Sequence, residues 1–156
     1  MMIARLLTVI GLLLPLAARA IIPAPCEISA KWVGWDRPTV ARSPRLEVGS
    51  ASYFELSQPG KLELPFINNQ IAFDKSFGGT IGLRIPHSGI VDLAISTDVS
   101  VQVLRNGQVI AFETRPFAPD CSGIQQTLRW KAKPGKYAIV IGRSWNATIE
   151  LMAVYG

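Results

Sequence analysis

Histidine and cysteine, the usual ligands of structural zinc, are scarce in this sequence. The chain has one histidine, His87, and two cysteines, Cys26 and Cys121, among 156 residues. A structural zinc site takes about four such side chains, so the composition disfavours zinc. His87 lies in a turn between two apolar runs, where a lone histidine is more often a solvated loop residue than a catalytic base. We expect neither zinc nor histidine-centred catalysis, and we expect no cofactor.

Motifs of nucleophilic and phosphate-transferring enzymes are missing as well. Gly142-Arg143-Ser144-Trp145-Asn146 begins like the nucleophile elbow G-x-S-x-G, but asparagine replaces the second glycine and apolar strand patterns flank it on both sides. Gly78-Gly79 is not followed by the Lys-Ser of a phosphate-binding loop. The 11 acidic residues are scattered singly, which leaves a small hydrolase with a carboxylate pair as the enzymatic alternative. The sequence therefore favours a protein that is not an enzyme.

Helical periodicity is also absent after residue 20. No stretch of eleven or more residues keeps apolar positions at helical spacing without an intervening Gly or Pro. Short alternating apolar runs bounded by turn residues occur instead, which is typical of an antiparallel β-sandwich or barrel with eight or nine short strands. We expect strands over Ser52–Leu56, Lys61–Phe66, Thr80–Ile85, Ile90–Ile95, Val99–Leu104, Gln126–Ala132, Lys136–Ile141 and Ala147–Val154, the last two forming a closing hairpin.

One hairpin has a strong local signal. Asn106-Gly107 stands between the alternating valines Val101 and Val103 and the apolar residues that follow. A type I′ turn needs positive φ at both central residues, and Asn-Gly is the pair that most readily adopts it. We therefore expect a tight hairpin centred on these two residues.

The first twenty residues, MMIARLLTVIGLLLPLAARA, have the pattern of an export signal. Arg5 precedes an apolar run from Leu6 to Leu16, and Ala18-Arg19-Ala20 fits the small-x-small cleavage rule. The run is short for a membrane-spanning helix, which needs about 20 apolar residues, so an uncleaved anchor is the alternative. We expect 1–20 to be a cleaved signal peptide, the mature protein to have no transmembrane segment, and its location to be periplasmic or secreted.

Residues 21–50 differ from the rest, being rich in Pro and turn-forming residues, with one short strand candidate around Glu27 to Val33. We interpret them as an N-terminal arm attached to a β-sandwich domain at 51–156. In an oxidising compartment Cys26 and Cys121 are expected to form a disulfide that ties the arm to the domain. Two free, buried thiols are the alternative.

Positive charge is modest once the signal segment is set aside. Without Arg5 and Arg19 the formal net charge falls from +5 to +3. In a strand, Arg129, Lys131 and Lys133 share one face, which we interpret as a solvated strand face. A nucleic-acid site would show a larger basic patch with interleaved aromatics, so we expect no nucleic-acid partner.

Five pieces of the sequence have a characteristic hairpin pattern: Ser52-Tyr53-Phe54-Glu55-Leu56, Thr97-Asp98-Val99-Ser100-Val101, Asn106-Gly107, Pro134-Gly135-Lys136-Tyr137 and Thr148-Ile149-Glu150-Leu151. Together they resemble the bacterial pre-peptidase C-terminal (PPC-like) domain family over about residues 50–154. The resemblance implies a jelly-roll-like β-sandwich that accompanies secreted proteases and in some members binds collagen or calcium. Asp98, with Asp92 on the preceding strand, is the calcium candidate it implies, although Ser100 stands where a second acid is often found.

Tryptophan is the one residue type that suggests a binding site. Trp145 lies in the closing turn beside Arg143 and Asn146, and Trp32 and Trp35 lie three apart on the arm, so that in a strand one would face the core and the other solvent. An exposed tryptophan beside polar groups can stack on a sugar or anchor a protein partner; the alternative is that the rings cap the core.

We therefore expect an exported binding or accessory domain of the cell envelope that recognises a glycan, a peptide or a protein partner through its loops and an exposed aromatic. A periplasmic inhibitor or assembly factor that acts on another envelope protein is the alternative of a different class.

The predicted disulfide has a direct test. Positions 26 and 121 are 95 residues apart, and a cross-link closing such a loop stabilises a fold by roughly 4–5 kcal/mol in the chain-entropy account. Mass spectrometry after alkylation without reductant should show no added label. Two added labels would contradict the bridge.

Overall fold

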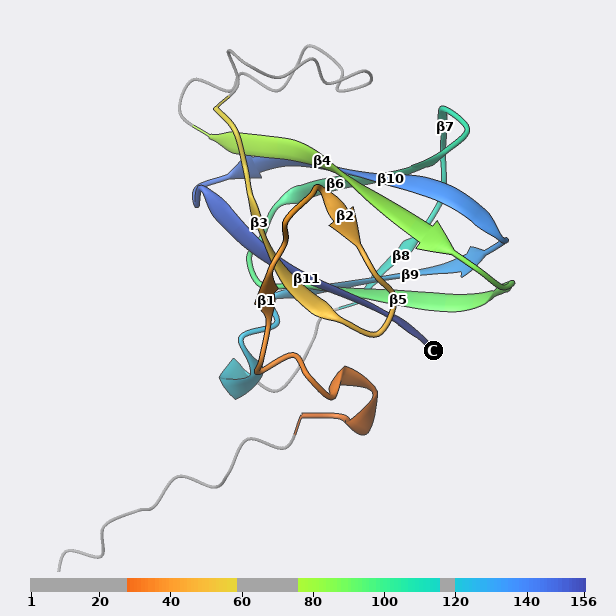
Figure 1. Cartoon of the computed structure of the whole chain (residues 1–156), viewed down its shortest axis with the longest axis horizontal. Coiled ribbons are helices and arrows are strands. Elements are labelled where there is room, and N and C mark those ends of the chain that lie inside the picture. Colours follow the sequence, from red (N-terminus) through yellow and green to blue (C-terminus); the bar gives the residue numbers. More distant parts are fainter. Residues whose placement is uncertain (1–27, 59–75, 116–119) are drawn as a thin grey trace, which may run out of the picture.

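Two β-sheets stacked face to face make up the described part of the chain (Figure 1). The computed structural model describes residues 28–58, 76–115 and 120–156. The expected signal peptide, Cys26 and the strand expected over Lys61–Phe66 lie outside these residues. Cys121 is not a free thiol in the structure, and its bridge to Cys26 stays a prediction.

The first sheet has the strand order β1-β3-β11-β5-β9-β8 and the second sheet the order β2-β4-β10-β6-β7. Two short 3₁₀ helices, η1 (Ala30–Trp32) and η3 (Asp120–Ser122), lie outside the sheets. The strands are β1 (Thr39–Val40), β2 (Arg45–Leu46), β3 (Ala51–Glu55), β4 (Phe77–Ile85), β5 (Gly89–Ile95), β6 (Ser100–Arg105), β7 (Gln108–Val109), β8 (Glu113–Arg115), β9 (Gln126–Ala132), β10 (Gly135–Ser144) and β11 (Thr148–Tyr155).

The all-β sandwich expected from the sequence is confirmed, with one difference in strand number and pairing. The described residues contain eleven strands. Besides β8 (Glu113–Arg115), which was also not expected, there are two unexpected strands from the arm, β1 and β2. Each is two residues long and pairs in parallel, β1 with β3 and β2 with β4, so the sheets are mixed. Strands this short carry no alternating pattern, which is why the sequence did not indicate them.

The expected closing hairpin is wrong. β10 pairs with β4 and β6 in the second sheet, whereas β11 pairs with β3 and β5 in the first. The turn between them carries the chain from one sheet to the other. Alternation fixes which face of a strand is buried, but it does not fix which neighbour the strand takes.

Two further local features are the Asn106-Gly107 turn and the backbone of the arm around η1. Asn106 has φ 51° and Gly107 φ 76°, and β6 pairs antiparallel with β7 on either side of them, so the tight hairpin is confirmed. The strand expected around Glu27 to Val33 is wrong, because the backbone forms η1 there, with the amide of Trp32 donating to the carbonyl of Ser29 at 2.8 Å.

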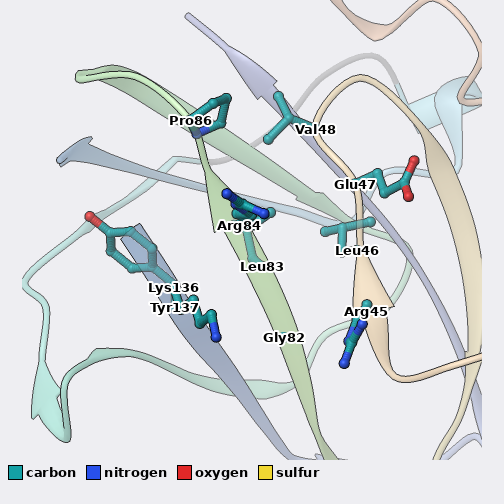
Figure 2. A pocket seen from close by; sticks show the side chains of 10 residues that line it. All are labelled: Arg45, Leu46, Glu47, Val48, Gly82, Leu83, Arg84, Pro86, Lys136 and Tyr137. Carbon is teal, nitrogen blue, oxygen red and sulfur yellow. The ribbon is translucent and has the colours of Figure 1, made fainter. Parts of the chain in front are cut away.

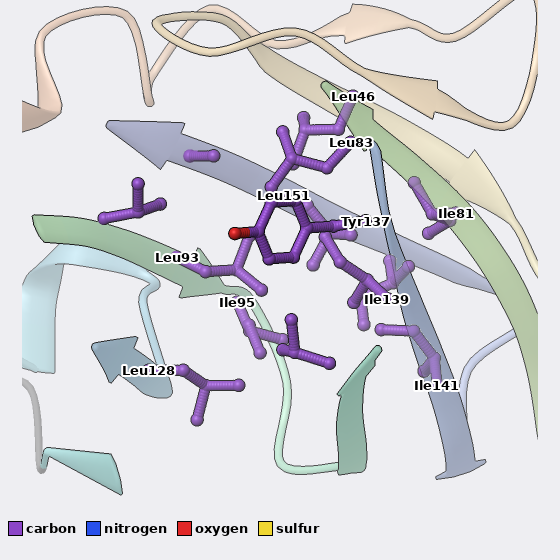
Figure 3. Packing of buried hydrophobic residues seen from close by; sticks show 14 of the residues in the cluster. Leu46, Ile81, Leu83, Leu93, Ile95, Leu128, Tyr137, Ile139, Ile141 and Leu151 are labelled. Atoms are coloured by element: carbon purple, nitrogen blue, oxygen red, sulfur yellow. The ribbon is translucent and has the colours of Figure 1, made fainter. Parts of the chain in front are cut away.

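The main core fills the space between the two sheets (Figure 3). Alternation places Ile139 and Ile141 of β10 opposite Ile149 and Leu151 of β11, all buried. Tyr137 packs at one end of this core, and its hydroxyl donates to the carbonyl of Lys133 at 2.8 Å and accepts from the Lys133 amide at 2.9 Å. Further members of the core are Leu46, Phe54, Ile81, Leu83, Ile85, Val91, Leu93, Ile95, Val103, Leu128 and Trp130.

A second, smaller core covers the outer face of the first sheet. Trp32 and Trp35 of the arm pack there against Ala94, Met152 and their neighbours. Their exposed fractions are 1% and 4%, so the expectation that one of the pair faces solvent is wrong. The residues adopt a 3₁₀ turn rather than a strand, which brings both rings to the sheet. The indole N–H of Trp35 donates to the carbonyl of Ser122 at 2.9 Å.

A charged cluster anchors the arm beside this second core. Asp92 of β5 is fully buried on the outer face of the first sheet. Arg129 of β9, its register partner, donates to both carboxylate oxygens of Asp92 at 2.5 Å, and Nζ of Lys31 on the arm donates to Oδ2 at 2.9 Å. Arg129 is therefore an ion-pair partner, whereas Lys131 on the same strand is exposed as expected.

These hydrogen bonds control the protonation of Asp92. Burial alone would raise the pKa of its carboxyl, but the hydrogen bonds from Arg129 and Lys31 outweigh it and hold the pKa below its ordinary value. A depressed folded-state pKa contributes stability above the pKa of the unfolded chain, and this contribution is lost as the pH falls through the folded-state value.

Replacing Asp92 tests this cluster. Asp92→Asn should lower the free energy of unfolding at neutral pH by about 2–4 kcal/mol, since two cations lose their counter-charge while remaining partly solvated. The variant should also lose less stability than the wild type between about pH 5 and pH 2. Urea unfolding across that range measures both effects. Asp98→Asn, at an exposed position, is the matched control and should change the free energy by less than about 0.5 kcal/mol; equal effects of the two substitutions would contradict the cluster's role.

Candidate functional site

The candidate site is the connection between β10 and β11, which begins with a β-bulge. Ile141 is the register partner of Gly79, and Ser144 is that of Phe77, so β10 has one residue more than β4 between these pairs. Arg143 lies in the bulge with φ 60°, a left-handed conformation that favours glycine. The extra residue redirects the end of β10 and sets the direction of the turn that follows.

Ser144 holds this turn in place. The side chain is fully buried, and its hydroxyl donates to the carbonyl of Asn146 at 2.8 Å and accepts from the Asn146 amide at 3.2 Å. The amide of Leu56 donates to the carbonyl of Ala147 at 2.7 Å, which ties the turn to the end of β3. The turn is therefore fixed from both sides.

Trp145 stands at the apex of this turn, with 79% of its surface exposed. Arg143 and Asn146 are exposed on either side, so three of the five residues predicted to bind are brought together. Trp32 and Trp35 are not: they lie buried under the arm, and Trp130 is buried in the main core. Trp145 is thus the one exposed ring among the four tryptophans, all of which the structure describes.

The side chains that could suggest catalysis have other roles. The hydroxyl of Ser144 is used within the turn. The ring of His87 stacks on Tyr155, with ring centroids 6.1 Å apart, and the Tyr155 hydroxyl contacts the backbone of His87. Both oxygens of Asp92, a calcium candidate, are taken by cations, and Asp98 is exposed. In the ranges that the structure describes, no three His, Cys, Asp or Glu side chains are grouped to hold a metal ion.

Glu150 is a buried acid that the sequence did not single out. It lies on β11 opposite Tyr53 of β3 and is 7% exposed. Burial raises the pKa of Glu150, and the nearby Glu150 charge in turn raises the pKa of Tyr53. Because an acid with a raised folded-state pKa favours folding in its protonated form, Glu150 lowers stability as the pH rises through that pKa.

A groove opens at the other end of β10. Its volume is about 690 Å³, and Arg45, Glu47, Arg84, Pro86 and Lys136 are among the residues that line it. The sequence did not indicate this groove, because its residues come from strands β2, β4 and β10 and from the segments that follow β2 and β4. The pairing of these strands cannot be deduced from alternation. A smaller hollow of about 310 Å³ lies between the β1–β2 link and strands β3 and β4.

Comparisons with known proteins return one structural similarity. The structure is similar to the crystal structure of the pre-peptidase C-terminal domain of collagenase from Bacillus anthracis, with a TM-score of 0.42 and 14% sequence identity over 70% of this chain and 91% of that chain. This is the same class of domain that the hairpin motifs resemble. No family model matches the sequence, and no curated protein matches it.

Within the ranges that the structure describes, no helix is both long enough and apolar enough to cross a bilayer.

The left-handed position in the bulge generates a prediction. Arg143→Gly should leave the free energy of unfolding unchanged or raise it by up to about 1 kcal/mol, since glycine adopts φ near 60° without the steric cost that other residues have. Arg143→Val should lower it by at least about 1 kcal/mol, because a β-branched side chain tolerates this conformation worst. Urea unfolding of the two variants measures the difference. An equal loss in both would show that the arginine side chain, and not the backbone, determines stability here.

Proposed function

We propose that this protein is an exported, non-catalytic binding domain that holds a protein partner of the cell envelope through Trp145. The observation that carries the proposal is the exposure of Trp145 on a turn fixed by Ser144 and by the end of β3. Exposing a large aromatic ring to water costs free energy, which burial against a partner would recover. Tryptophan is also among the residues most enriched at the energetic centres of protein interfaces.

Rigidity of the turn supports binding. A side chain whose backbone is already fixed loses less conformational entropy when it is immobilised by a partner. Arg143 and Asn146 beside the ring supply a charge and an amide that can form the polar rim of a contact. The export part of the proposal rests on the signal pattern of residues 1–20.

The shape around Trp145 favours a protein partner over a glycan. Trp145 lies at the apex of the turn and is 79% exposed. A ring that projects from a turn is suited to insertion into a pocket of a partner, whereas a sugar chain is usually held in a cleft with several polar groups around it. Binding of a protein partner in this way is consistent with the role of an accessory domain and also with that of an inhibitor or assembly factor.

Fluorescence quenching provides the first test. Because Trp32, Trp35 and Trp130 are buried, acrylamide should quench mainly the emission of Trp145, and Trp145→Phe should remove most of the quenchable fraction. Soluble envelope glycans should not protect the ring from acrylamide. Protection by a glycan would overturn the choice of a protein partner.

Photo-crosslinking provides the second test. A photoreactive phenylalanine analogue at position 145 should give, in an envelope extract of the source organism, a discrete adduct that excess wild-type protein suppresses and Trp145→Ala does not. The same analogue in place of Val109, which is 57% exposed on β7, is the matched control. No adduct at position 145, or the same adducts at both positions, would contradict the proposal.

A further inference from the structure

The groove at the start of β10 has a cationic rim. Arg45 of β2, Arg84 of β4 and Lys136 of β10 line it together with one acid, Glu47. In Figure 2 the Glu47 carboxylate points away from the three cationic groups. The groove therefore carries an excess of positive charge, and its volume of about 690 Å³ is within the range of ligand sites.

Two of these cations lie in directly opposed positions on neighbouring strands. Arg84 and Lys136 are direct register partners on β4 and β10, and like charges in directly opposed positions destabilise an antiparallel pair. Arg45 is the register partner of Gly82, two residues before Arg84 on the same face of β4. The three cations thus lie on the same outer face of the second sheet, on the adjacent strands β2, β4 and β10.

Nothing in the described part of the chain neutralises this charge. Among the described residues, the side chains of Arg45, Arg84 and Lys136 make no hydrogen bond and no ion pair. The contrast with Arg129 is informative, because that cation lies in the same kind of cross-strand position but is matched to Asp92. The repulsion between Arg84 and Lys136 lowers the stability of the sheet and is not compensated by a counter-charge. Residues that lower stability without compensation are expected at functional sites.

The floor of the groove differs chemically from its rim. Val48 and Pro86 contribute apolar surface, whereas Leu46 and Leu83, which also line the groove, are 2% exposed and belong to the main core. The hydroxyl of Tyr137, which also lines the groove, is already used by the backbone of Lys133. An apolar floor without free hydrogen-bond donors suits an aliphatic or aromatic side chain, whereas sugar hydroxyls placed there would be left unpaired.

From this combination we infer that the groove binds an acidic peptide segment of a partner protein. Its carboxylates would contact Arg45, Arg84 and Lys136, and an apolar side chain would lie on the floor. Arginine forks pair with carboxylates in a bidentate manner, so Arg45 and Arg84 supply specificity as well as charge.

This inference is independent of the proposed role of Trp145. Lys136 and Trp145 are nine residues apart, and at the rise of a β-strand this separation is roughly 30 Å. The two surfaces therefore occupy opposite ends of β10, and either can fail without the other.

Fluorescence anisotropy tests the inference with a fluorescein-labelled octapeptide of alternating Asp or Glu and Leu residues. The purified protein should bind it saturably and more weakly at 300 mM than at 50 mM NaCl, because the contact is electrostatic. The double variant Arg84→Gln/Lys136→Gln should raise the Kd at least about tenfold. The same peptide with Asn and Gln in place of Asp and Glu should not bind.

Matched controls separate this site from general attraction between charges. The double variant Arg37→Gln/Lys131→Gln removes the same charge from exposed positions elsewhere and should change the Kd less than twofold. Trp145→Phe should bind the peptide as the wild type does. The Tm of Arg84→Gln/Lys136→Gln should equal or exceed that of the wild type, since the cross-strand repulsion is removed.

Several outcomes would overturn the inference. They are the absence of saturable binding, an equal loss of affinity in both double variants, and binding of the uncharged peptide. Binding of polygalacturonate through Arg84 and Lys136 without binding of the peptide would assign the groove to an anionic glycan instead. A lower Tm of Arg84→Gln/Lys136→Gln would show that these cations stabilise the sheet and would contradict the argument from repulsion.

Discussion

The ion cluster formed by Asp92, Arg129 and Lys31 is the interaction on which the rest of the structure depends. It joins β5, β9 and the arm on the outer face of the first sheet, where an ordinary sandwich would meet water. With the arm in place, Trp32 and Trp35 form a second core, and β11 is buried on both faces. A buried carboxylate without these partners would have to lose its charge, so the cluster and the covered face require each other.

Because the arm covers the outer face of the first sheet, binding surfaces are left elsewhere on the molecule. By burying two tryptophans it leaves Trp145 as the exposed ring among the four, at one end of β10, while the cationic groove opens at the other end. Each surface contains a feature that lowers stability. Arg143 adopts a left-handed backbone conformation, and Arg84 lies opposite Lys136 on the neighbouring strand. Strand β10 is hydrogen-bonded on both sides in the middle of the second sheet, which keeps both of these features in fixed positions.

Much of the fold follows from the sequence, because alternation and turn residues are local signals. The range expected for β9 agrees with the structure residue for residue, and Asn106-Gly107 fixed its hairpin. The pairing of segments that are far apart in the sequence could not be predicted from these local signals. The pairing of β10 and β11 in different sheets, the parallel strands of the arm and the match between Asp92 and Arg129 all depend on register between distant segments. Of the site, the turn with Trp145, Arg143 and Asn146 could be predicted, whereas the burial of Trp32 and Trp35 and the groove could not.

The assignment of Trp145 as the contact residue depends on the arm staying in place, since a detached arm would expose two further tryptophans. Native-state hydrogen exchange at the indole N–H of Trp35, compared with the backbone amide of Leu151, tests this most directly. The Trp35 indole is bonded to the carbonyl of Ser122, and Leu151 lies in the centre of β11. If the arm and the sandwich unfold as one unit, the two groups exchange with opening free energies within about 1 kcal/mol of each other. Exchange of the Trp35 indole at a nearly unprotected rate, with Leu151 still protected, would contradict the account.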